Sequence, residues 1–511
     1  MEIAVDDGGL ASLRQWGIEF LSKARCGLEE VRFEDGGRLR QGDLAGRSVA
    51  DAAARTVRTR YPWGAVTCSY RPGPDRLDLG IAIDNRSGHT IAVFKMAPLE
   101  LRLPEAPREY DGSTPLLAAN KGDPTVVPLT WRSGRIVLVN EDPARPLVAG
   151  FPWALDRPIN TRFVLRLTTG KEEMYPDSIP AAPRPIPDGA TDTLALSLRF
   201  ARPDTPVESV AADVYARFRQ DFPYHLDWPD RRPIGAIFLG ASEGRSPTNP
   251  RGWFMDPARD FRSPAGVRDF RRRVLALAAD SVRRLKAMDA QGMIVWDLEG
   301  DQFDHPVTYV GDASRIDDLA PEFAPVVDSF FRTFREAGLR VGLLIRPQRF
   351  VLDADGRGRQ EEVSDPAEIE RLLDRKITFA QSAWGCTLFH IDSNGDPNDP
   401  IDAAIIERLA AAHPDVLLIP EHETTRYYSF SAPWLLLRPP QLFAATPARV
   451  REVYPQAFAA IDISDGDLEA YHDALVEGVR HGDILLFRAY YDDPANPEAK
   501  AIHDEAKAGA R

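Results

Sequence analysis

After Pro233 the sequence alternates short, uninterrupted apolar segments with longer amphipathic ones, and this alternation restricts the fold more than any other feature. Apolar segments without polar alternation are typical of strands buried on both faces of a parallel sheet. Strands that alternate with helices indicate β/α units. We expect such strands at residues 234–239, 293–296, 341–345, 387–391, 416–419, 458–463 and 484–487, with one more inside 434–443. Residues 233–511 therefore predict an α/β fold, a (β/α)8 TIM barrel.

A doubly wound sheet is the competing architecture for the same alternation. It would need a glycine-rich turn after its first strand to bind a nucleotide, and no such turn is present. Helix boundaries also fit a barrel. Ser263-Pro264 predicts the start of a long helix, and Asp365-Pro366 with Glu368 predicts a capped helix that ends at Gly385.

Residues 1–204 have a different pattern, with short strands separated by turns rich in proline and glycine. Apolar side chains alternate with small or polar ones along residues 77–83, which indicates a half-buried strand. We expect further strands at residues 90–94, 135–139, 162–167 and 193–200. These features predict a β-sandwich. Residues 205–232 are expected to be a helix and linker, with Thr205 and Glu208 forming a capping box around Pro206.

Composition limits the partners. The net charge is −14 and the pI about 5.3, so we expect binding neither to nucleic acid nor to anionic membranes. A neutral carbohydrate is compatible with this surface. Three scattered cysteines form no disulfide framework, which favours a reducing, cytoplasmic compartment. The first seven residues lack the pattern of a signal peptide, although a signal removed beforehand would leave the same start.

Charged residues stand at the ends of the expected barrel strands. In a barrel the carboxyl ends of all strands meet at one rim, where active sites form. Clustered carboxylates repel one another, so such convergence is hard to explain structurally. The strand ends carry Asp297 and Glu299, Arg346 and Arg349, His390 and Asp392, Glu421, His422 and Glu423, and finally Asp462 and Asp465.

Asp392 and Glu421 close neighbouring strands and suggest hydrolysis of a glycosidic bond. Retaining hydrolysis needs two carboxyl groups about 5–5.5 Å apart, one as nucleophile and one as proton donor. Asp has the short reach of a nucleophile, whereas Glu reaches further, as a proton donor must. The like charge of Asp392 would raise the pKa of Glu421 and keep it protonated. Glu423 competes for the acid role.

The segments Phe389-His390-Ile391-Asp392 and Pro420-Glu421-His422-Glu423 resemble those of retaining α-glycosidases of the α-amylase clan and the endo-α-N-acetylgalactosaminidases. That resemblance covers the barrel and implies an Asp nucleophile on the fourth strand and a Glu acid on the fifth. A second resemblance is to α-galactosidase-like enzymes, which take the acid from the sixth strand. It would implicate Asp462 or Asp465 if the strand count were shifted.

Other polar and aromatic residues near these strand ends are expected to contact the sugar. Tyr427 and Tyr428 follow the acid candidates and would stack on a pyranose ring. Arg346 and Arg349 would either bind hydroxyls or hold Asp392 ionised. The expected substrate-binding residues are Asp297, Glu299, Arg346, Arg349, His390, His422, Tyr427, Tyr428 and Asp465.

Two alternatives stay open from the sequence. One is a carbohydrate-binding protein without catalysis. The other is a metal-assisted barrel isomerase or lyase with ligands among His390, His422, Glu421 and Asp392. No cofactor or metal is expected under the main hypothesis. The loop after Asp392 departs from a calcium-binding EF-hand because its twelfth position is Ala403.

Overall fold

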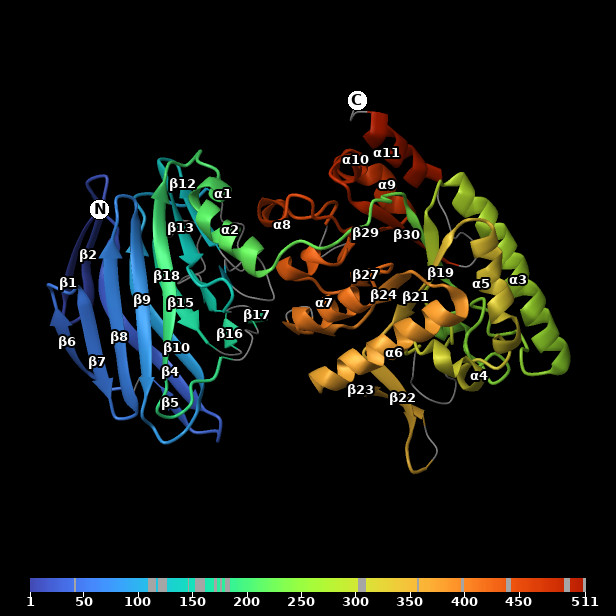
Figure 1. Cartoon of the computed structure of the whole chain (residues 1–511), viewed down its shortest axis with the longest axis horizontal. Helices are drawn as coiled ribbons and strands as arrows, with labels where there is room; N and C mark the ends of the chain where they lie inside the picture. The colour runs from blue at the N-terminus through green and yellow to red at the C-terminus, as the bar shows by residue number, and fades with distance from the viewer. Residues whose placement is uncertain are drawn as a thin grey trace. The chain divides into compact units, whose positions relative to one another are not determined.

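The computed structural model describes residues 1–40, 43–108, 116–117, 126–145, 147–151, 161–169, 172–174, 177–179, 184–301, 309–355, 358–396, 399–437, 443–490 and 497–508. The chain divides into two compact units, Met1–Pro223 and Tyr224–Arg511. Each unit is described by itself below (Figure 1).

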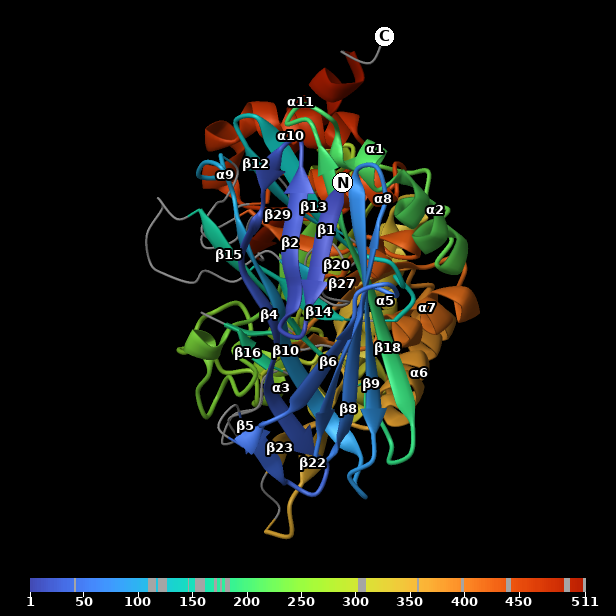
Figure 2. The same ribbon diagram turned by 90° about the vertical axis from the view of Figure 1, so that its left-hand side faces the viewer.

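The first unit consists of antiparallel sheets, and the predicted β-sandwich is confirmed. A seven-stranded sheet has the order β12-β13-β18-β9-β8-β7-β6, and a six-stranded sheet has the order β11-β14-β15-β10-β4-β5. Figure 2 shows β6, β8, β9 and β18 of this sheet running alongside one another. Leu79, Leu196, Phe94 and Leu165 come from both sheets and belong to one buried core, so the sheets face each other across it.

The strands of the first unit have the following bounds: β1 Glu2–Asp6, β2 Gly9–Gln15, β3 Ile18–Glu19, β4 Leu21–Phe33, β5 Arg38–Arg40, β6 Arg47–Asp51, β7 Thr56–Tyr61, β8 Gly64–Pro72, β9 Arg76–Asn85, β10 Ile91–Arg102, β11 Leu116–Leu117, β12 Val126–Trp131, β13 Gly134–Asn140, β14 Val148–Gly150, β15 Arg162–Thr168, β16 Glu172–Met174, β17 Asp177–Ile179 and β18 Thr191–Ala201. The expected alternation along residues 77–83 is present, because buried and half-buried positions alternate throughout β9.

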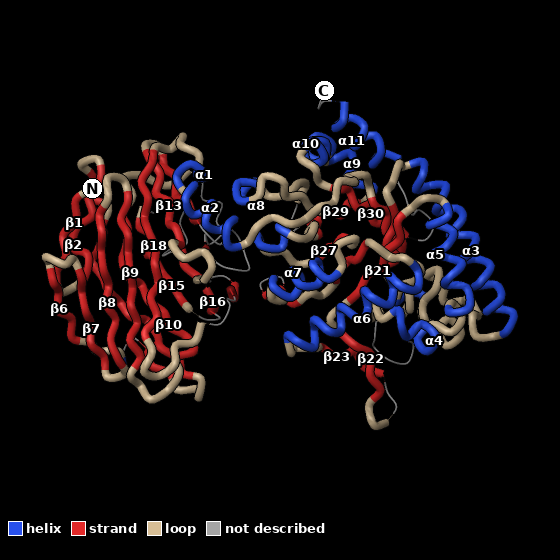
Figure 3. The backbone as a smooth tube through the Cα atoms, viewed as in Figure 1, coloured by secondary structure: helices blue, strands red, loops and turns tan. Residues whose placement is uncertain are grey.

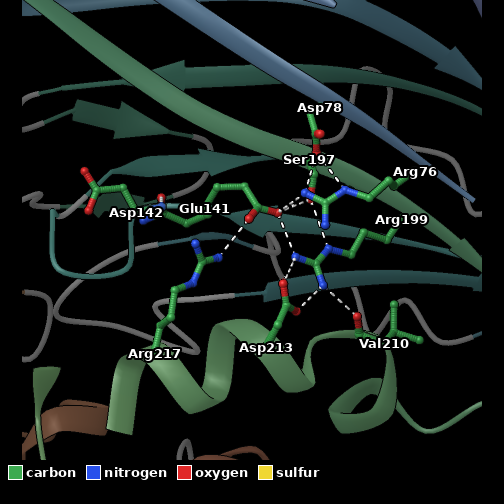
Figure 4. Close-up of polar contacts among 10 residues, drawn as sticks. Arg76, Asp78, Glu141, Asp142, Ser197, Arg199, Val210, Asp213 and Arg217 are labelled. Carbon is green, nitrogen blue, oxygen red and sulfur yellow. Dashed lines mark hydrogen bonds and ion pairs between the residues drawn. The ribbon is translucent and has the colours of Figure 1, made fainter. Parts of the chain in front are cut away.

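The helix predicted after Thr205 is broken in two, α1 (Val207–Val210) and α2 (Ala212–Asp221). The predicted capping box is wrong, since Pro206 is the N-cap and no side chain caps α1. An arginine of the sheet strand β18 contacts the backbone at this break. Arg199 Nη1 donates to the carbonyl of Val210 at 2.8 Å (Figure 4), and that carbonyl then accepts the arginine at the point where the helix stops.

The second unit contains an eight-stranded parallel sheet with the order β27-β24-β21-β20-β19-β30-β29-β28, flanked by helices (Figure 3). Between the outer strands, the Ala432 N–H just before β28 donates to the Leu418 carbonyl of β27 at 3.0 Å. The sheet is thus a nearly closed (β/α)8 barrel, as predicted. Its strands are β19 Ile234–Phe238, β20 Gly292–Val295, β21 Arg340–Ile345, β24 Leu388–Ile391, β27 Leu417–Pro420, β28 Trp434–Leu436, β29 Ala460–Ile463 and β30 Ile484–Tyr490.

Two helices of the second unit begin at the predicted caps. Ser263 accepts the N–H of Gly266 at the start of α3, and Asp365 accepts that of Glu368 at the start of α6. Gly385 ends α6 with a φ of 67°, a conformation that glycine adopts without steric cost. The helices are α3 Pro264–Ala287, α4 Ile316–Leu319, α5 Val327–Glu336, α6 Pro366–Trp384, α7 Ala403–Ala412, α8 Ala448–Val453, α9 Asp465–Ala470, α10 His472–Arg480 and α11 Pro497–Ala508.

Two short hairpins, β22 (Gln348–Leu352) with β23 (Gly358–Glu362) and β25 (Gly395–Asp396) with β26 (Asp399–Pro400), follow the third and fourth barrel strands. Trp228 precedes the first strand and packs in the barrel core with residues such as Ile234 and Ile484. Its indole N–H donates to Gln291 at 3.1 Å. The boundary between the two units, between Pro223 and Tyr224, falls inside residues 205–232, which were expected to be a helix and linker.

Candidate active site

Asp392 extends the pairing of β24 with β21, and Glu421 extends the pairing of β27 with β24, each just beyond the strand end. The N–H of Asp392 donates to the Ile345 carbonyl at 3.0 Å, and the N–H of Glu421 donates to the Ile391 carbonyl at 2.9 Å. The ladder thereby fixes both backbones at the same rim. A hydrogen bond joins the two carboxyl groups. The two side chains, predicted from the sequence to lie close together, are in contact at this rim.

Asp392 lies against a guanidinium. Arg346 Nε donates to Asp392 Oδ2 at 2.7 Å, and only 11% of the Asp392 side chain is exposed. Burial raises the pKa of Asp392, but the charges of Arg346 and His390 and the hydrogen bond from Glu421 outweigh it, so the pKa lies below its ordinary value. Asp392 is therefore the member of the pair that carries the negative charge.

Glu421 has the opposite electrostatic environment. Its burial, followed by the charge of Asp392 and the hydrogen bond to it, raises the pKa of Glu421 to about 7. The Ser393 N–H donates to Glu421 Oε2 at 2.7 Å and opposes this rise. A carboxyl group with such a pKa is protonated below neutral pH and can donate a proton. The pair thus consists of one ionised and one protonated carboxyl group.

The loops after β24 and β27 are tied together behind the pair. Ser393 adopts a φ of 53°, which is uncommon for a residue with a side chain. The fully buried Asn394 accepts the N–H of His422 at 2.8 Å and donates to its carbonyl at 3.1 Å. This amide bridges the two loops as a strand would. It therefore fixes Glu421 relative to Asp392.

Glu423, the competing acid candidate, faces another partner. The Tyr428 hydroxyl donates to Glu423 Oε2. Burial raises the pKa of Glu423 above its ordinary value, although this hydrogen bond opposes the rise. The rings of Tyr427 and Tyr428 are fully buried, and the Tyr427 hydroxyl donates to the Ile401 carbonyl at 2.5 Å. A buried ring offers no face to a sugar, so the predicted stacking role of both tyrosines is corrected.

The two arginines after β21 have different partners. Arg346 holds Asp392, and its guanidinium lies 4.4 Å from the centre of the Tyr309 ring. Arg349 instead donates to Glu368 at 2.5 Å and to Glu361 at 3.0 Å. Because those contacts hold the β22–β23 hairpin against α6, Arg349 is removed from the predicted substrate-binding set.

Asp297 and Glu299, expected to bind hydroxyls, bind backbone N–H groups. Asp297 accepts from Leu239 at 2.8 Å and from Gly240 at 2.6 Å, which links the ends of β20 and β19. Glu299 Oε1 accepts from Val310 at 2.8 Å and from its two successors. Both side chains are at most 3% exposed. Their predicted contact with a sugar is therefore corrected to a structural role.

The two histidines flank the pair. His390 is buried inside the barrel, where its ring stacks on Trp296 at 4.5 Å and its Nδ1 lies 3.0 Å from the Ile419 carbonyl. His422 Nε2 lies 3.7 Å from Glu421 Oε2, and its side chain is 14% exposed. His422 is therefore the histidine that stands beside the proposed proton donor.

The alternative acid positions do not fit the strand count. Asp462 lies on β29, which is the seventh strand, and is fully buried. Asp465 begins α9, and its side chain lies outside the described residues. The sixth strand is β28, and the sequence holds no Asp or Glu from Thr424 to Arg451. The α-galactosidase-like arrangement with its acid on the sixth strand is therefore not available here.

No family model matches this sequence, and no curated protein matches it. Among solved structures, the chain is similar to the GH36 α-galactosidase AgaB from Geobacillus stearothermophilus at 12% identity, with a TM-score of 0.42 over 94% of this chain and 74% of that one. It is similar to a β-arabinopyranosidase at 9% identity, with a TM-score of 0.34 over 84% and 66%. An α-amylase from Malbranchea cinnamomea matches at 10% identity, with a TM-score of 0.30 over 54% and 73%. These likenesses concern architecture, and the site is assigned from its own geometry.

A metal-binding cluster and a membrane-spanning helix are both absent from the part of the chain that the structure describes. No group of three or more His, Cys, Asp or Glu residues is arranged to hold a metal ion. The ligand set proposed for a metal-assisted enzyme, His390, His422, Glu421 and Asp392, is therefore not assembled into such a group among these residues. Among the same residues, no helix has the length and apolar composition needed to cross a membrane.

Sequence reasoning missed Tyr309, Asn394, Asp301 and Lys376. Asp301 is 5% exposed and follows β20, and the charge of Arg346 acts on it. Lys376 is 2% exposed. A signal was available for this lysine, because position 376 falls on the buried face of α6 between Leu372 and Ala380. Tyr309 and Asn394 lie on loops and carry no comparable periodic signal.

Proposed function

We propose that the barrel hydrolyses a glycosidic bond with retention of configuration, using Asp392 as the nucleophile and Glu421 as the acid and base. One observation supports this above the others. Two carboxyl groups on neighbouring strand ends contact each other and differ in charge, because Arg346 holds Asp392 ionised while Glu421 has a pKa of about 7. This is the division of roles that double displacement requires.

The reaction uses each carboxyl group in turn. The Asp392 carboxylate attacks the anomeric carbon as the bond to the leaving oxygen breaks, and Glu421 gives that oxygen its proton. Glu421, now ionised, takes a proton from water, whose oxygen attacks the same carbon and releases Asp392. Two inversions give net retention. Both groups end in their starting protonation states.

The two carboxyl groups must separate for this chemistry. They are hydrogen-bonded in the structure, whereas a retaining pair works at about 5–5.5 Å. Arg346 fixes Asp392, while the Glu421 side chain has one more rotatable bond and is 24% exposed. We therefore expect Glu421 to rotate away from Asp392 when a glycosidic oxygen enters between them.

The substrate class follows from the resemblance and the charge. The fourth- and fifth-strand motifs resemble those of α-glycosidases, so an α-linked oligosaccharide, polysaccharide or glycoconjugate is proposed. A net charge of −14 suits a neutral sugar. Arg346 and His422 are the side chains proposed to reach it. A carbohydrate-binding protein without catalysis is the alternative, and it gives no reason for the split charge states of the pair.

A stereochemical experiment tests the proposal. Aryl α- and β-glycosides are screened for release of the aryl alcohol, and the configuration of the first-formed sugar is followed by proton NMR. We expect hydrolysis of an α-glycoside with retention. Glu421→Ala should regain activity on a substrate with a good leaving group when azide is added, giving a glycosyl azide of retained configuration. Inversion, or full turnover by Asp392→Asn, would falsify the assignment.

A further inference from the structure

Lys376 is a buried cation that uses all three of its protons on backbone carbonyl groups. Its Nζ donates to Val310 at 2.7 Å, to Arg346 at 2.7 Å and to Gln348 at 2.8 Å. Burying an ammonium group is costly unless its hydrogen bonds are satisfied, and here they are. The lysine comes from α6, yet its three acceptors lie on the segments that follow two barrel strands, β20 and β21.

Glu299 holds one of those segments from the opposite side. Its Oε1 accepts the N–H of Val310, whose carbonyl accepts Lys376. One peptide segment therefore lies between a carboxyl group that accepts from its N–H groups and an ammonium group that donates to its carbonyl oxygen. Gly311, at a φ of +68°, allows this segment to pack closely, because a Cβ there would lie 2.4 Å from the Cα of Ile345.

The clamped segment supports the guanidinium that contacts Asp392. The Tyr309 carbonyl accepts Arg346 Nη1 at 3.2 Å, and the Tyr309 ring lies against the same guanidinium. Lys376 also holds the carbonyl of Arg346 itself. Both the backbone of Arg346 and the surface on which its side chain rests are thus fixed by one lysine.

We propose that Lys376 is a positioning residue that sets Arg346 against Asp392, with Glu299 as its counterpart across the clamped segment. It touches no reacting atom and acts through Arg346. The effect of Lys376 on catalysis rests on the function proposed above. The charged groups that act on Lys376 are Asp312, Glu299, Arg346 and Arg375. Those that act on Asp392 are Arg346 and His390, and Glu421 acts on it through a hydrogen bond.

The test measures the titration of Asp392 directly, so it does not depend on finding the substrate. Asp and Glu carboxyl carbons are labelled with ¹³C in the full chain, and the Asp392 signal is assigned by its loss in Asp392→Asn. In Lys376→Met we expect the Asp392 pKa to rise by about 1 unit, because a displaced opposite charge no longer favours the ionised form. Lys286→Met, an exposed lysine of α3, is the matched control and should leave it unchanged.

Activity and a second variant complete the experiment. With an active substrate, the acid limb of kcat/KM should rise with the Asp392 pKa, and kcat should fall about 10²-fold. If Lys376→Met does not fold, Lys376→Gln, which keeps a neutral donor, carries the same test. A folded variant with an unchanged Asp392 titration overturns the positioning role. A shifted titration in a protein that hydrolyses no glycoside supports the positioning role and overturns the proposed function.

Discussion

The Tyr428 hydroxyl donates to the Glu423 carboxyl group, which leaves Glu421, two residues earlier, as the glutamate that bonds Asp392. We therefore expect Glu421→Gln to lower kcat about 10²- to 10⁴-fold, the range typical of a lost general acid. Glu423→Gln should lower it less than about 10-fold, because its side chain donates no proton in this mechanism. Steady-state kinetics of both variants on one aryl glycoside would decide, and a larger loss in Glu423→Gln would reverse the assignment.

The pH dependence of activity should show the two carboxyl groups as separate limbs. Glu421 has to be protonated, so kcat/KM should fall as the pH rises through about 7. Asp392 has to be ionised, so activity should persist below its ordinary pKa of 3.8 and fall only as the lowered value is passed. The profile of kcat/KM across pH 3–9, about the range that covers both limbs, measures this. In Glu421→Gln the alkaline limb should vanish while the acid limb stays.

Arg346 should control the acid limb. Arg346→Met removes the charge that holds Asp392 ionised, so the acid limb should move up by about 1–3 pH units. Arg349→Met is a matched control, since Arg349 bonds Glu361 and Glu368 instead. An unshifted limb in Arg346→Met, in a protein that melts normally, would contradict the role of this arginine.

The ion-pair network around Glu141 should stabilise the first unit. Arg199, 8% exposed, donates to Glu141 at 2.8 Å and to Asp213 at 2.5 Å (Figure 4). Without Arg199, Glu141 keeps Arg76 and Arg217 as partners, and Asp213 is 55% exposed. We therefore expect Arg199→Met to lower the free energy of unfolding by about 1–3 kcal/mol, as measured by chemical denaturation followed by circular dichroism.

The same network predicts a dependence of stability on pH. Burial raises the pKa of Glu141, but hydrogen bonds from Ser197 and Arg199 outweigh it and leave the pKa below its ordinary 4.5. The stabilisation is therefore fully present above pH 4.5 and is lost as the pH falls through the lower folded-state value. Glu141→Gln should flatten this dependence. Glu208→Gln, on an exposed residue of α1, should not change it.

The barrel and the position of its rim were predictable from the sequence because both depend on local patterns. Uninterrupted apolar strands, Ser263 and Asp365 as caps, and Gly385 as a stop each reflect neighbours in the chain. The meeting of Asp392 and Glu421 followed, since parallel strands end at one edge. A barrel built from such units needs no further information to bring strand ends together.

The direction of side chains beyond the strand ends was not predictable. Outside a strand the alternation that orients side chains is lost, so the burial of Tyr427 and Tyr428 depends on tertiary packing. The break between α1 and α2 coincides with a hydrogen bond from Arg199, which lies on a sheet strand. The clamp by Lys376 likewise joins a helix to loops that are distant in the chain.

Trp228 belongs to the segment ahead of the first barrel strand, and its side chain packs into the barrel core. Its ring packs with Ile234 and Ile484, and Arg340 lies 4.5 Å above it. A chain shortened to begin at Tyr224 would keep this side chain. A chain that begins at Pro233 would lose it and expose the barrel core to water beside Ile234 and Ile484. The ten residues ahead of the first strand, 224–233, thus belong to the smallest piece expected to fold as a barrel.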